Sequence, residues 1–163
     1  MRNKKESQFT ERLIELKRTS TKRKGGPLFH YSALAVVGDE KGKVGIATAK
    51  SKENVGAINK AIEKAAENMV EIKLTKNHSI PHEIYIKDGA SKILMKPAAL
   101  GSGIIAGGTV RDIAEVAGIK NISIKTLGTK NPVSNARCFM KALSMLKDTP
   151  ASLKIKDSIE ENK

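Results

Sequence analysis

Two runs of cations without acidic residues carry the clearest chemistry in this sequence. Residues 17–24 hold five Lys and Arg side chains and three small hydroxyl residues, and Gly25-Gly26 follows directly. A second acid-free run extends over residues 125–147. Cations and hydroxyl groups bind phosphate oxygens, and a glycine without a Cβ lets backbone amides approach a phosphate closely. The runs together predict contacts to a polyanion, although either run alone is also compatible with a solvated loop.

The overall charge favours the same interpretation. The chain of 163 residues has 30 Lys and Arg against 17 Asp and Glu, which gives a net charge of +13 and a pI near 9.9. Small proteins with such an excess of positive charge commonly bind nucleic acid. A solubilising, Lys-rich surface is the alternative interpretation.

The composition also bears on which nucleic acid is bound. Aromatic residues make up only 3% of the chain and Trp is absent, which argues against a platform that stacks single-stranded bases. The expected helix-strand-strand-helix unit with a basic loop suits the shape and backbone of double-helical RNA, and no helix of the DNA-reading kind is seen. The candidate RNA-binding residues are Arg18, Thr19, Ser20, Thr21, Lys22, Arg23, Lys24, Gly25, Gly26, Lys43, Lys50, Lys52, Lys125 and Arg137.

The glycine-rich segment is a weaker indication of a binding site. The glycines of residues 101–108 could cradle a phosphate, but the segment lacks the GK[ST] of a P-loop. The acidic residue that would hold a ribose is also missing, since positions 121 and 125 are Asn and Lys. A tight turn with close helix packing, or a protein contact surface, is the preferred interpretation. An ATP-dependent, kinase-like enzyme remains an alternative.

Metal, catalytic and membrane signatures are not found. Pro81 separates His78 from His82, and neither these residues nor His30 has the neighbours of a metal site. No catalytic triad or acid pair is recognised, so we expect no enzyme activity, cofactor or small-molecule substrate. The single Cys138 fits a reducing compartment, and neither an apolar membrane span nor a secretory signal is present. A cytoplasmic location is expected.

Hydrophobic periodicity places the first run within an α+β unit over residues 8–74. A helix is predicted over residues 9–18, strands over 28–37 and 43–49, and a long helix after a Ser51 cap, through Met69. Residues 1–7 are expected to form a disordered tail.

A second unit is predicted over residues 82–147, after a linker at residues 75–81. Strands are expected over residues 82–87, 91–96 and 122–127. One helix follows the glycine-rich loop and ends at Gly118, and another begins at Asn131-Pro132. Residues 148–163 are expected to be a mobile tail. The fold class is therefore α+β with two small domains.

Ordered segments of the chain resemble a known family. The segments are RTSTKRKGG (residues 18–26), FHYSALAVVGD (29–39), GKVG (42–45), AINKAIEKAAENM (57–69), IPHE (80–83), KPAALGSGIIAGGTVRDIAEVAGIKNI (96–122) and TLGTKNP (126–132). They are similar to the small-subunit ribosomal protein five family, of bacterial type. Pro27 and Thr21 stand where that family often has Arg and Lys, and residues 47–49 replace its more usual G-Y-G.

The resemblance implies an N-terminal double-stranded-RNA-binding-like domain and a C-terminal βαβ-type domain. It further implies a structural constituent of the small ribosomal subunit that binds small-subunit rRNA, touches ribosomal proteins four and eight, and supports translational accuracy near the path by which mRNA enters. Residues 18–26 match the RNA-contacting loop of the family, and Gly103 and Arg111 match its interface with protein four. A double-stranded-RNA module acting outside the ribosome is a further alternative.

Overall fold

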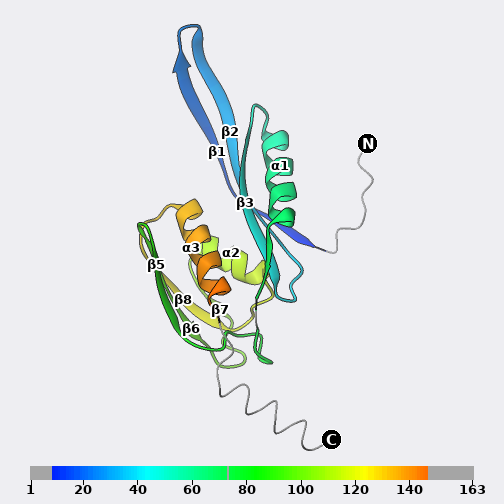
Figure 1. Cartoon of the computed structure of the whole chain (residues 1–163), viewed down its shortest axis with the longest axis vertical. Helices are drawn as coiled ribbons and strands as arrows, with labels where there is room; N and C mark the ends of the chain where they lie inside the picture. Colours follow the sequence, from blue (N-terminus) through cyan, green and yellow to red (C-terminus); the bar gives the residue numbers. More distant parts are fainter. Residues whose placement is uncertain (1–8, 73, 147–163) are drawn as a thin grey trace, which may run out of the picture.

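The computed structural model describes residues 9–72 and 74–146, and this part of the chain forms two four-stranded sheets and three helices (Figure 1). In chain order the elements are β1 (Thr10–Arg23), β2 (Gly26–Gly38), β3 (Lys43–Ser51), α1 (Asn54–Glu67), β4 (Met69–Glu71), β5 (Ile84–Asp88), β6 (Ser91–Pro97), β7 (Ile104–Ile105), α2 (Gly108–Val116), β8 (Ile122–Gly128) and α3 (Pro132–Ser144). The predicted α+β class is confirmed, whereas both predicted tails lie outside the described residues.

The first sheet has the antiparallel order β1-β2-β3-β4 and carries α1 on one face. Alanines form the contact between them, with Ala33, Ala35 and Ala49 of the strands packing against Ala57 and Ala61 of the helix. Their small side chains let the helix lie close to the sheet. The strands predicted over residues 28–37 and 43–49 are confirmed as β2 and β3.

The helix predicted over residues 9–18 is wrong, because these residues belong to β1. A bulge between Leu13 and Glu15 shifts the register against β2 by one residue. The shift places Leu13 and Leu16 on the same face of β1, opposite Ala35 and Ala33, although they are three residues apart as on a helical face. Long-range strand pairing therefore overrides the local pattern.

The helix boundaries of the first unit also differ from the prediction. Ser51 is the last residue of β3, and Glu53 is the N-cap residue of α1 without a side-chain cap bond. At the other end α1 stops at Glu67, so Met69 belongs to the short strand β4, which pairs with β3 and was not predicted. The side chain of Asn68 donates a hydrogen bond of 2.8 Å to the Lys64 carbonyl at this helix end.

The second sheet has the order β5-β6-β8-β7, and α2 and α3 lie on one of its faces (Figure 1). The predicted strands and helices of this half are confirmed within a few residues. α2 ends before Gly118, whose φ of +83° favours glycine, and the Asn131 side chain caps α3 through the Val133 amide at 3.1 Å. The two-residue β7, which was not predicted, runs parallel to β8, so β7-α2-β8 is a βαβ unit.

One apolar core continues from the first sheet into the second half. Leu34, Val36 and Val44 of the first sheet belong to the same buried cluster as Val116 of α2 and Phe139 of α3. Ser79 and Ile80, within the predicted linker, are buried as well. The two halves therefore pack as one body, and the exact domain limits stay a prediction. No helix among the described residues is long and apolar enough to cross a membrane.

Candidate nucleic-acid interface

The ends of β1 and β2 project beyond α1 as a two-stranded arm, which we define as residues 17–31 (Figure 1). The pairing continues to Arg23 opposite Gly26, so only Lys24 and Gly25 form the turn. The basic segment expected as a flexible loop is therefore mostly strand. Gly26 has a φ of +116°, which explains a glycine there, and added Cβ atoms at Gly25 and Gly26 would meet nothing within 4 Å. The tip is thus open to a partner.

The cations of the arm are distributed over both of its faces. Strand alternation places Arg18, Ser20 and Lys22 on the face that continues into the α1 side of the sheet. The opposite face carries Lys17, Thr19, Thr21 and Arg23. A polyanion that surrounds or borders the arm would therefore meet positive charge from either side.

Few internal contacts occupy these side chains. The Arg18 guanidinium carbon lies 3.8 Å from the centre of the Phe29 ring, and the Lys17 Nζ lies 2.9 Å from Glu15 Oε1. The Thr19 hydroxyl donates to the His30 carbonyl at 3.2 Å. Lys22, Arg23 and Lys24 have no ion pair with any acidic side chain in the described part of the chain. Their charges are available to a partner.

A groove at the base of the arm extends this positive surface. We define the base groove by its lining residues, which are His30, Lys50, Ser51, Lys52, Glu53 and Lys60, and its volume is about 540 Å³. Lys50 and Lys17 both stand opposite Ser32, on the strands that flank it. The arm, Lys50 and Lys52 therefore lie along one continuous surface that ends at the N-terminus of α1.

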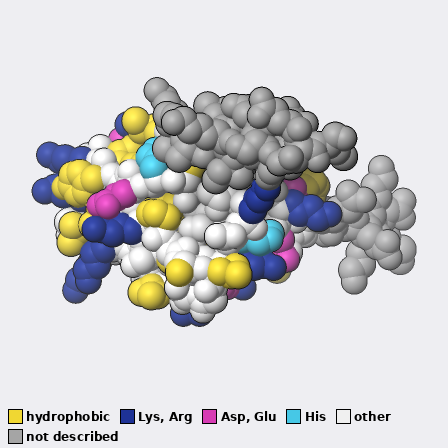
Figure 2. All heavy atoms as spheres, turned by 90° about the horizontal axis from the view of Figure 1, so that it is seen from below, with side chains coloured by type: hydrophobic (Ala, Val, Ile, Leu, Met, Phe, Trp, Pro, Cys, Tyr) yellow, Lys and Arg dark blue, Asp and Glu magenta, His cyan; other side chains and the backbone are white. Residues whose placement is uncertain are grey.

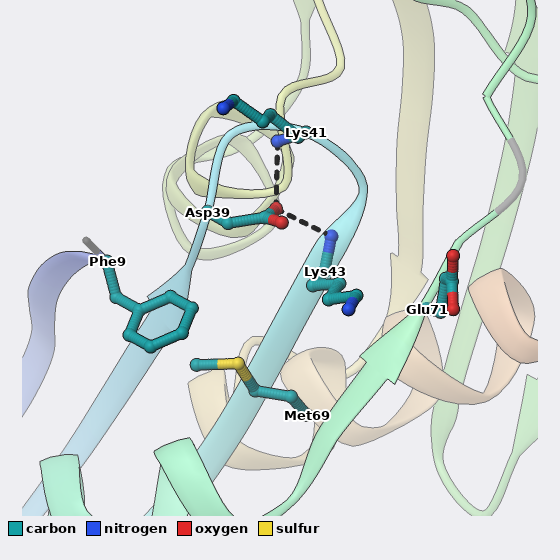
Figure 3. A pocket seen from close by; sticks show the side chains of 6 residues that line it. All are labelled: Phe9, Asp39, Lys41, Lys43, Met69 and Glu71. Atoms are coloured by element: carbon teal, nitrogen blue, oxygen red, sulfur yellow. Dashed lines mark hydrogen bonds between the residues drawn. The ribbon is translucent and has the colours of Figure 1, made fainter.

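Lys43 lies apart from that surface, at the other end of β3. Lys50 is seven residues further along the strand, which is roughly 23 Å. It lines an open pocket together with Phe9, Asp39, Lys41, Met69 and Glu71, where the Phe9 and Met69 side chains face each other (Figure 3). The structure therefore does not join Lys43 to the arm.

The turn beside Lys43 is held by the Asp39 carboxylate. It accepts hydrogen bonds of 2.8 Å from the backbone amides of Lys41 and Lys43. Burial raises the pKa of Asp39, but the hydrogen bonds from Lys43 and Lys41 outweigh burial, and the net pKa is lowered. Asp39 thus stays ionised and holds the turn in place.

Lys125 and Arg137 lie on two further surfaces. Lys125 is on the face of the second sheet away from the helices, opposite Leu94, and strand alternation places Lys87, Lys92 and Lys96 on the same face. Sequence reasoning missed these three lysines, although the alternation of β5 and β6 could have revealed them. Figure 2 shows Lys and Arg side chains projecting at several places in a view from below, with few Asp and Glu side chains beside them.

Arg137 of α3 lines a groove between the two halves of the molecule. Lys64 and Asn68 from the end of α1 and Thr48 of β3 lie in the same lining, and the volume is about 270 Å³. The groove therefore combines two cations from distant parts of the sequence. Its charge is compatible with an anionic partner, but it is separate from the arm.

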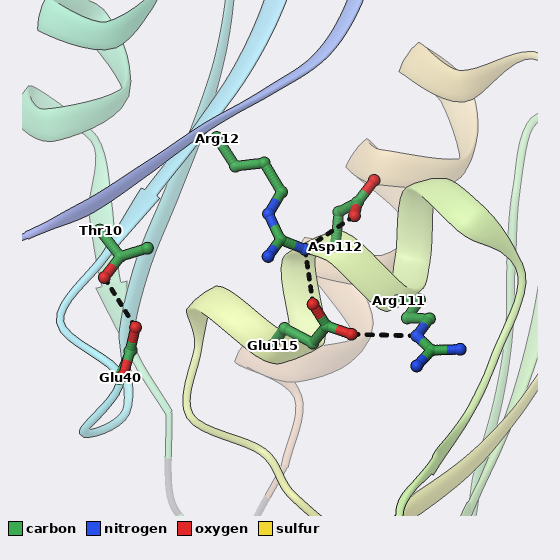
Figure 4. Close-up of polar contacts among 6 residues, drawn as sticks. All are labelled: Thr10, Arg12, Glu40, Arg111, Asp112 and Glu115. Atoms are coloured by element: carbon green, nitrogen blue, oxygen red, sulfur yellow. Dashed lines mark hydrogen bonds and ion pairs between the residues drawn. The ribbon is translucent and has the colours of Figure 1, made fainter.

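Gly103 and Arg111, the predicted protein-interface residues, lie on either side of β7. Gly103 has a φ of +71°. Arg111 donates to Glu115 at 2.9 Å within α2, and Glu115 also accepts from Arg12 of β1 (Figure 4). The hydrogen bonds from Arg111 and Arg12 lower the pKa of Glu115. Arg111 is exposed, yet it already has an acidic partner.

The glycine-rich segment does not have the geometry of a phosphate loop. The Asn121 side-chain oxygen accepts hydrogen bonds from the backbone amides of Gly101 and Gly103, at 3.0 and 3.3 Å. Those amides are therefore not turned toward a ligand, and β7 separates them from the start of α2 at Gly108. This geometry disfavours the nucleotide-enzyme alternative. No group of three potential metal ligands occurs within residues 9–72 and 74–146.

Comparison with known proteins gives matches over both halves. The family model for "Ribosomal protein S5, N-terminal domain" matches residues 9–73, and that for "Ribosomal protein S5, C-terminal domain" matches residues 86–155. The small ribosomal subunit protein uS5 of Acaryochloris marina is 42% identical over 147 residues, which are 90% of this chain and 83% of the relative. The corresponding protein uS5c of Rhodomonas salina is 43% identical over 143 residues, which are 88% of this chain and 85% of the relative.

Proposed function

This chain belongs to the ribosomal protein S5 family and is a structural constituent of the small ribosomal subunit rather than an enzyme, and we propose that the arm is its principal contact to small-subunit rRNA. The observation that carries the proposal is the arm itself. Its cations lie on both faces, outside the apolar core, and the three nearest the tip have no acidic partner in the described part of the chain.

The shape of the arm suits the backbone of folded RNA. Phosphate contacts provide a large share of the affinity of proteins for nucleic acid, and they position the protein without reading the sequence. The paired strands hold Arg18, Thr19, Ser20, Thr21, Lys22 and Arg23 in fixed positions, and the turn exposes Lys24, Gly25 and Gly26. Lys50 and Lys52 continue the contact into the base groove.

The remaining candidate residues belong to separate contacts in this proposal. Lys43 contacts rRNA at the far end of the first sheet, Lys125 on the open face of the second sheet, and Arg137 in the groove between the halves. Several dispersed contacts are what a protein embedded in folded RNA requires, because rRNA surrounds more than one of its faces.

We place the protein neighbours at the segment around β7 and α2. Gly103 and Arg111 would contact ribosomal protein four, and ribosomal protein eight would be a second neighbour, near the path by which mRNA enters. Through these contacts the chain would support translational accuracy. The proposal also retains domains over residues 8–74 and 82–147 and a cytoplasmic location on the ribosome. The exposed position of Arg111 supports it.

Sedimentation tests the proposed function. In a sucrose gradient at low salt, the full chain should travel with small subunits, and high salt should strip it from them, because counterion release makes phosphate contacts salt-dependent. Purified chain should also bind an in vitro transcript of small-subunit rRNA. A chain found wholly in the free fractions at low salt, without affinity for the transcript, would overturn the proposal.

A further inference from the structure

An exposed aromatic ring on the arm carries a stacked guanidinium. Phe29 is 41% exposed, and the Arg18 guanidinium carbon is 3.8 Å from its ring centre. The guanidinium therefore lies over the face of the ring, within the range of a cation–π contact. Phe29 does not belong to either apolar cluster, so core packing does not explain the residue.

A second ring lies on the same face of the arm. Tyr31 stands directly opposite Arg18 in the strand pairing, and Phe29 stands opposite Ser20, two pairs nearer the tip and so on the same face. Arg18 therefore has one ring position directly across the strand pair and the other diagonally across, toward the tip. The chain has only three Phe and two Tyr. The strand pairing thus brings two of its five aromatic residues together on one face, beside Arg18, Ser20 and Lys22.

We propose that Arg18 and Phe29 form a stacking site for one unpaired nucleobase of the bound rRNA. Unpaired bases stack on aromatic rings and on arginine guanidinium planes, and such stacking does not depend on the identity of the base. Ser20 and Lys22, on the same face, supply donors to the phosphates on either side of that nucleotide. The inference rests on the proposed function, and it assigns the arm a base contact in addition to phosphate contacts.

A packing role is the competing explanation and makes different predictions. If Phe29 only covered the stem of Arg18, Leu would replace it without loss of RNA affinity. If Arg18 were only a charge near a phosphate, Lys would replace it equally well. A stacking site requires both planar groups, because Lys and Leu lack a flat face.

The variants Phe29→Leu, Arg18→Lys and Phe29→Tyr separate these roles. Affinity for the small-subunit rRNA transcript is measured for each full-length variant over a series of salt concentrations. We expect Phe29→Leu and Arg18→Lys each to bind about tenfold more weakly, with an unchanged salt slope, and Phe29→Tyr to bind like the wild type. The double variant Arg18→Lys/Phe29→Leu should bind little more weakly than either single variant, because both remove the same stack. Wild-type affinity of Arg18→Lys or Phe29→Leu would overturn the inference.

A tryptophan in place of Phe29 reports stacking directly, since the chain has no other Trp. The fluorescence of Phe29→Trp should be quenched by the rRNA transcript and not by a fully paired RNA duplex at equal bound fraction. Equal quenching by the duplex would overturn the stacking site. If the wild type binds the transcript and the variants bind equally well, only the stacking site is refuted. If the wild type itself has no affinity for the transcript, the proposed function is refuted as well. Thermal unfolding of each variant verifies that the fold is retained.

Discussion

Arg12 of β1 and Glu115 of α2 form an ion pair, although 103 residues separate them in the sequence. The same guanidinium donates to Asp112 at 2.9 Å, and the Glu115 carboxylate also accepts from Arg111 (Figure 4). The pair joins the base of the first sheet to the βαβ unit of the second half. It therefore adds a polar connection to the core that the two halves share.

Arg12→Ala should lower the free energy of unfolding by about 0.5–1 kcal/mol. Both partners are partly exposed, with 40% of the Arg12 and 33% of the Glu115 side chain accessible, so solvent screening limits the contribution. Chemical denaturation of Arg12→Ala, Glu115→Gln and the double variant measures the coupling. The control is Lys96→Ala, which removes an exposed contact of 3.4 Å to Glu83 within the second half. Additive losses from Arg12→Ala and Glu115→Gln would refute the coupling.

The contribution of Glu115 should depend on pH. The hydrogen bonds from Arg111 and Arg12 lower its pKa in the folded state below the ordinary value of 4.5. A carboxylate with a lowered folded pKa stabilises the protein above the unfolded pKa, and this stabilisation is lost as the pH falls through the folded pKa. The wild type should therefore exceed Glu115→Gln in stability at pH 7, and the difference should shrink below about pH 4.5. A difference that stays constant from pH 7 to pH 3 would contradict this origin.

The tip of the arm should contribute charge-dependent RNA affinity without stabilising the fold. Lys22, Arg23 and Lys24 are exposed and lie outside the core, so their replacement by Ala should leave the melting temperature unchanged. The triple variant should bind the small-subunit rRNA transcript more weakly. Its log-log salt slope should become shallower by about 0.9 for each lost contact, if the RNA behaves like a duplex.

The matched control for the tip replaces Lys41, Lys76 and Lys120 with Ala. These lysines are exposed and lie in loops away from the arm. Replacing them removes three positive charges, the same number as in the tip variant. If both triple variants lose equal affinity and show the same slope, net charge rather than the arm determines RNA binding.

Gly45→Ala should destabilise the first half. A Cβ at Gly45 would lie 2.1 Å from the Ala65 carbonyl oxygen, so β3 and α1 would have to move apart. Overpacking of this kind costs about 1–3 kcal/mol, which thermal or urea unfolding detects. Gly25→Ala is the control, because its Cβ would meet nothing within 4 Å. A Gly45→Ala variant as stable as Gly25→Ala would show that the helix and strand separate at little cost.

An element could be predicted from the sequence when its own residues specify it, and not when pairing with a distant strand does. α3 could be located from its own residues, since Asn131 caps it and Pro132 suits its first turn. β4 and β7 have three and two residues, and only their pairing with β3 and β8 makes them strands. β1 was mistaken for a helix because its bulge gives the apolar residues helical spacing.

In the candidate site too, local features were visible in the sequence, whereas features set by strand pairing were not. The charge run of residues 17–24 was evident in the sequence, and the structure places it on one projecting arm. The sequence predicts Lys43 on a strand and Lys50 at the start of the following helix, whereas the structure places them at opposite ends of β3. In the sequence Phe29 and Tyr31 indicate only a strand, and it is the pairing of β1 with β2 that brings them beside Arg18.

The sequence by itself determined the α+β class, the family and the excess positive charge, because these follow from composition, local periodicity and ordered segments of similar residues. Only the tertiary structure established that the basic run is a rigid strand arm, that Arg18 stacks on Phe29, and that Arg12 pairs with Glu115. Each of these features depends on strand register or on contact between distant segments. Such contacts form when the chain buries its shared apolar core, and no local pattern encodes them.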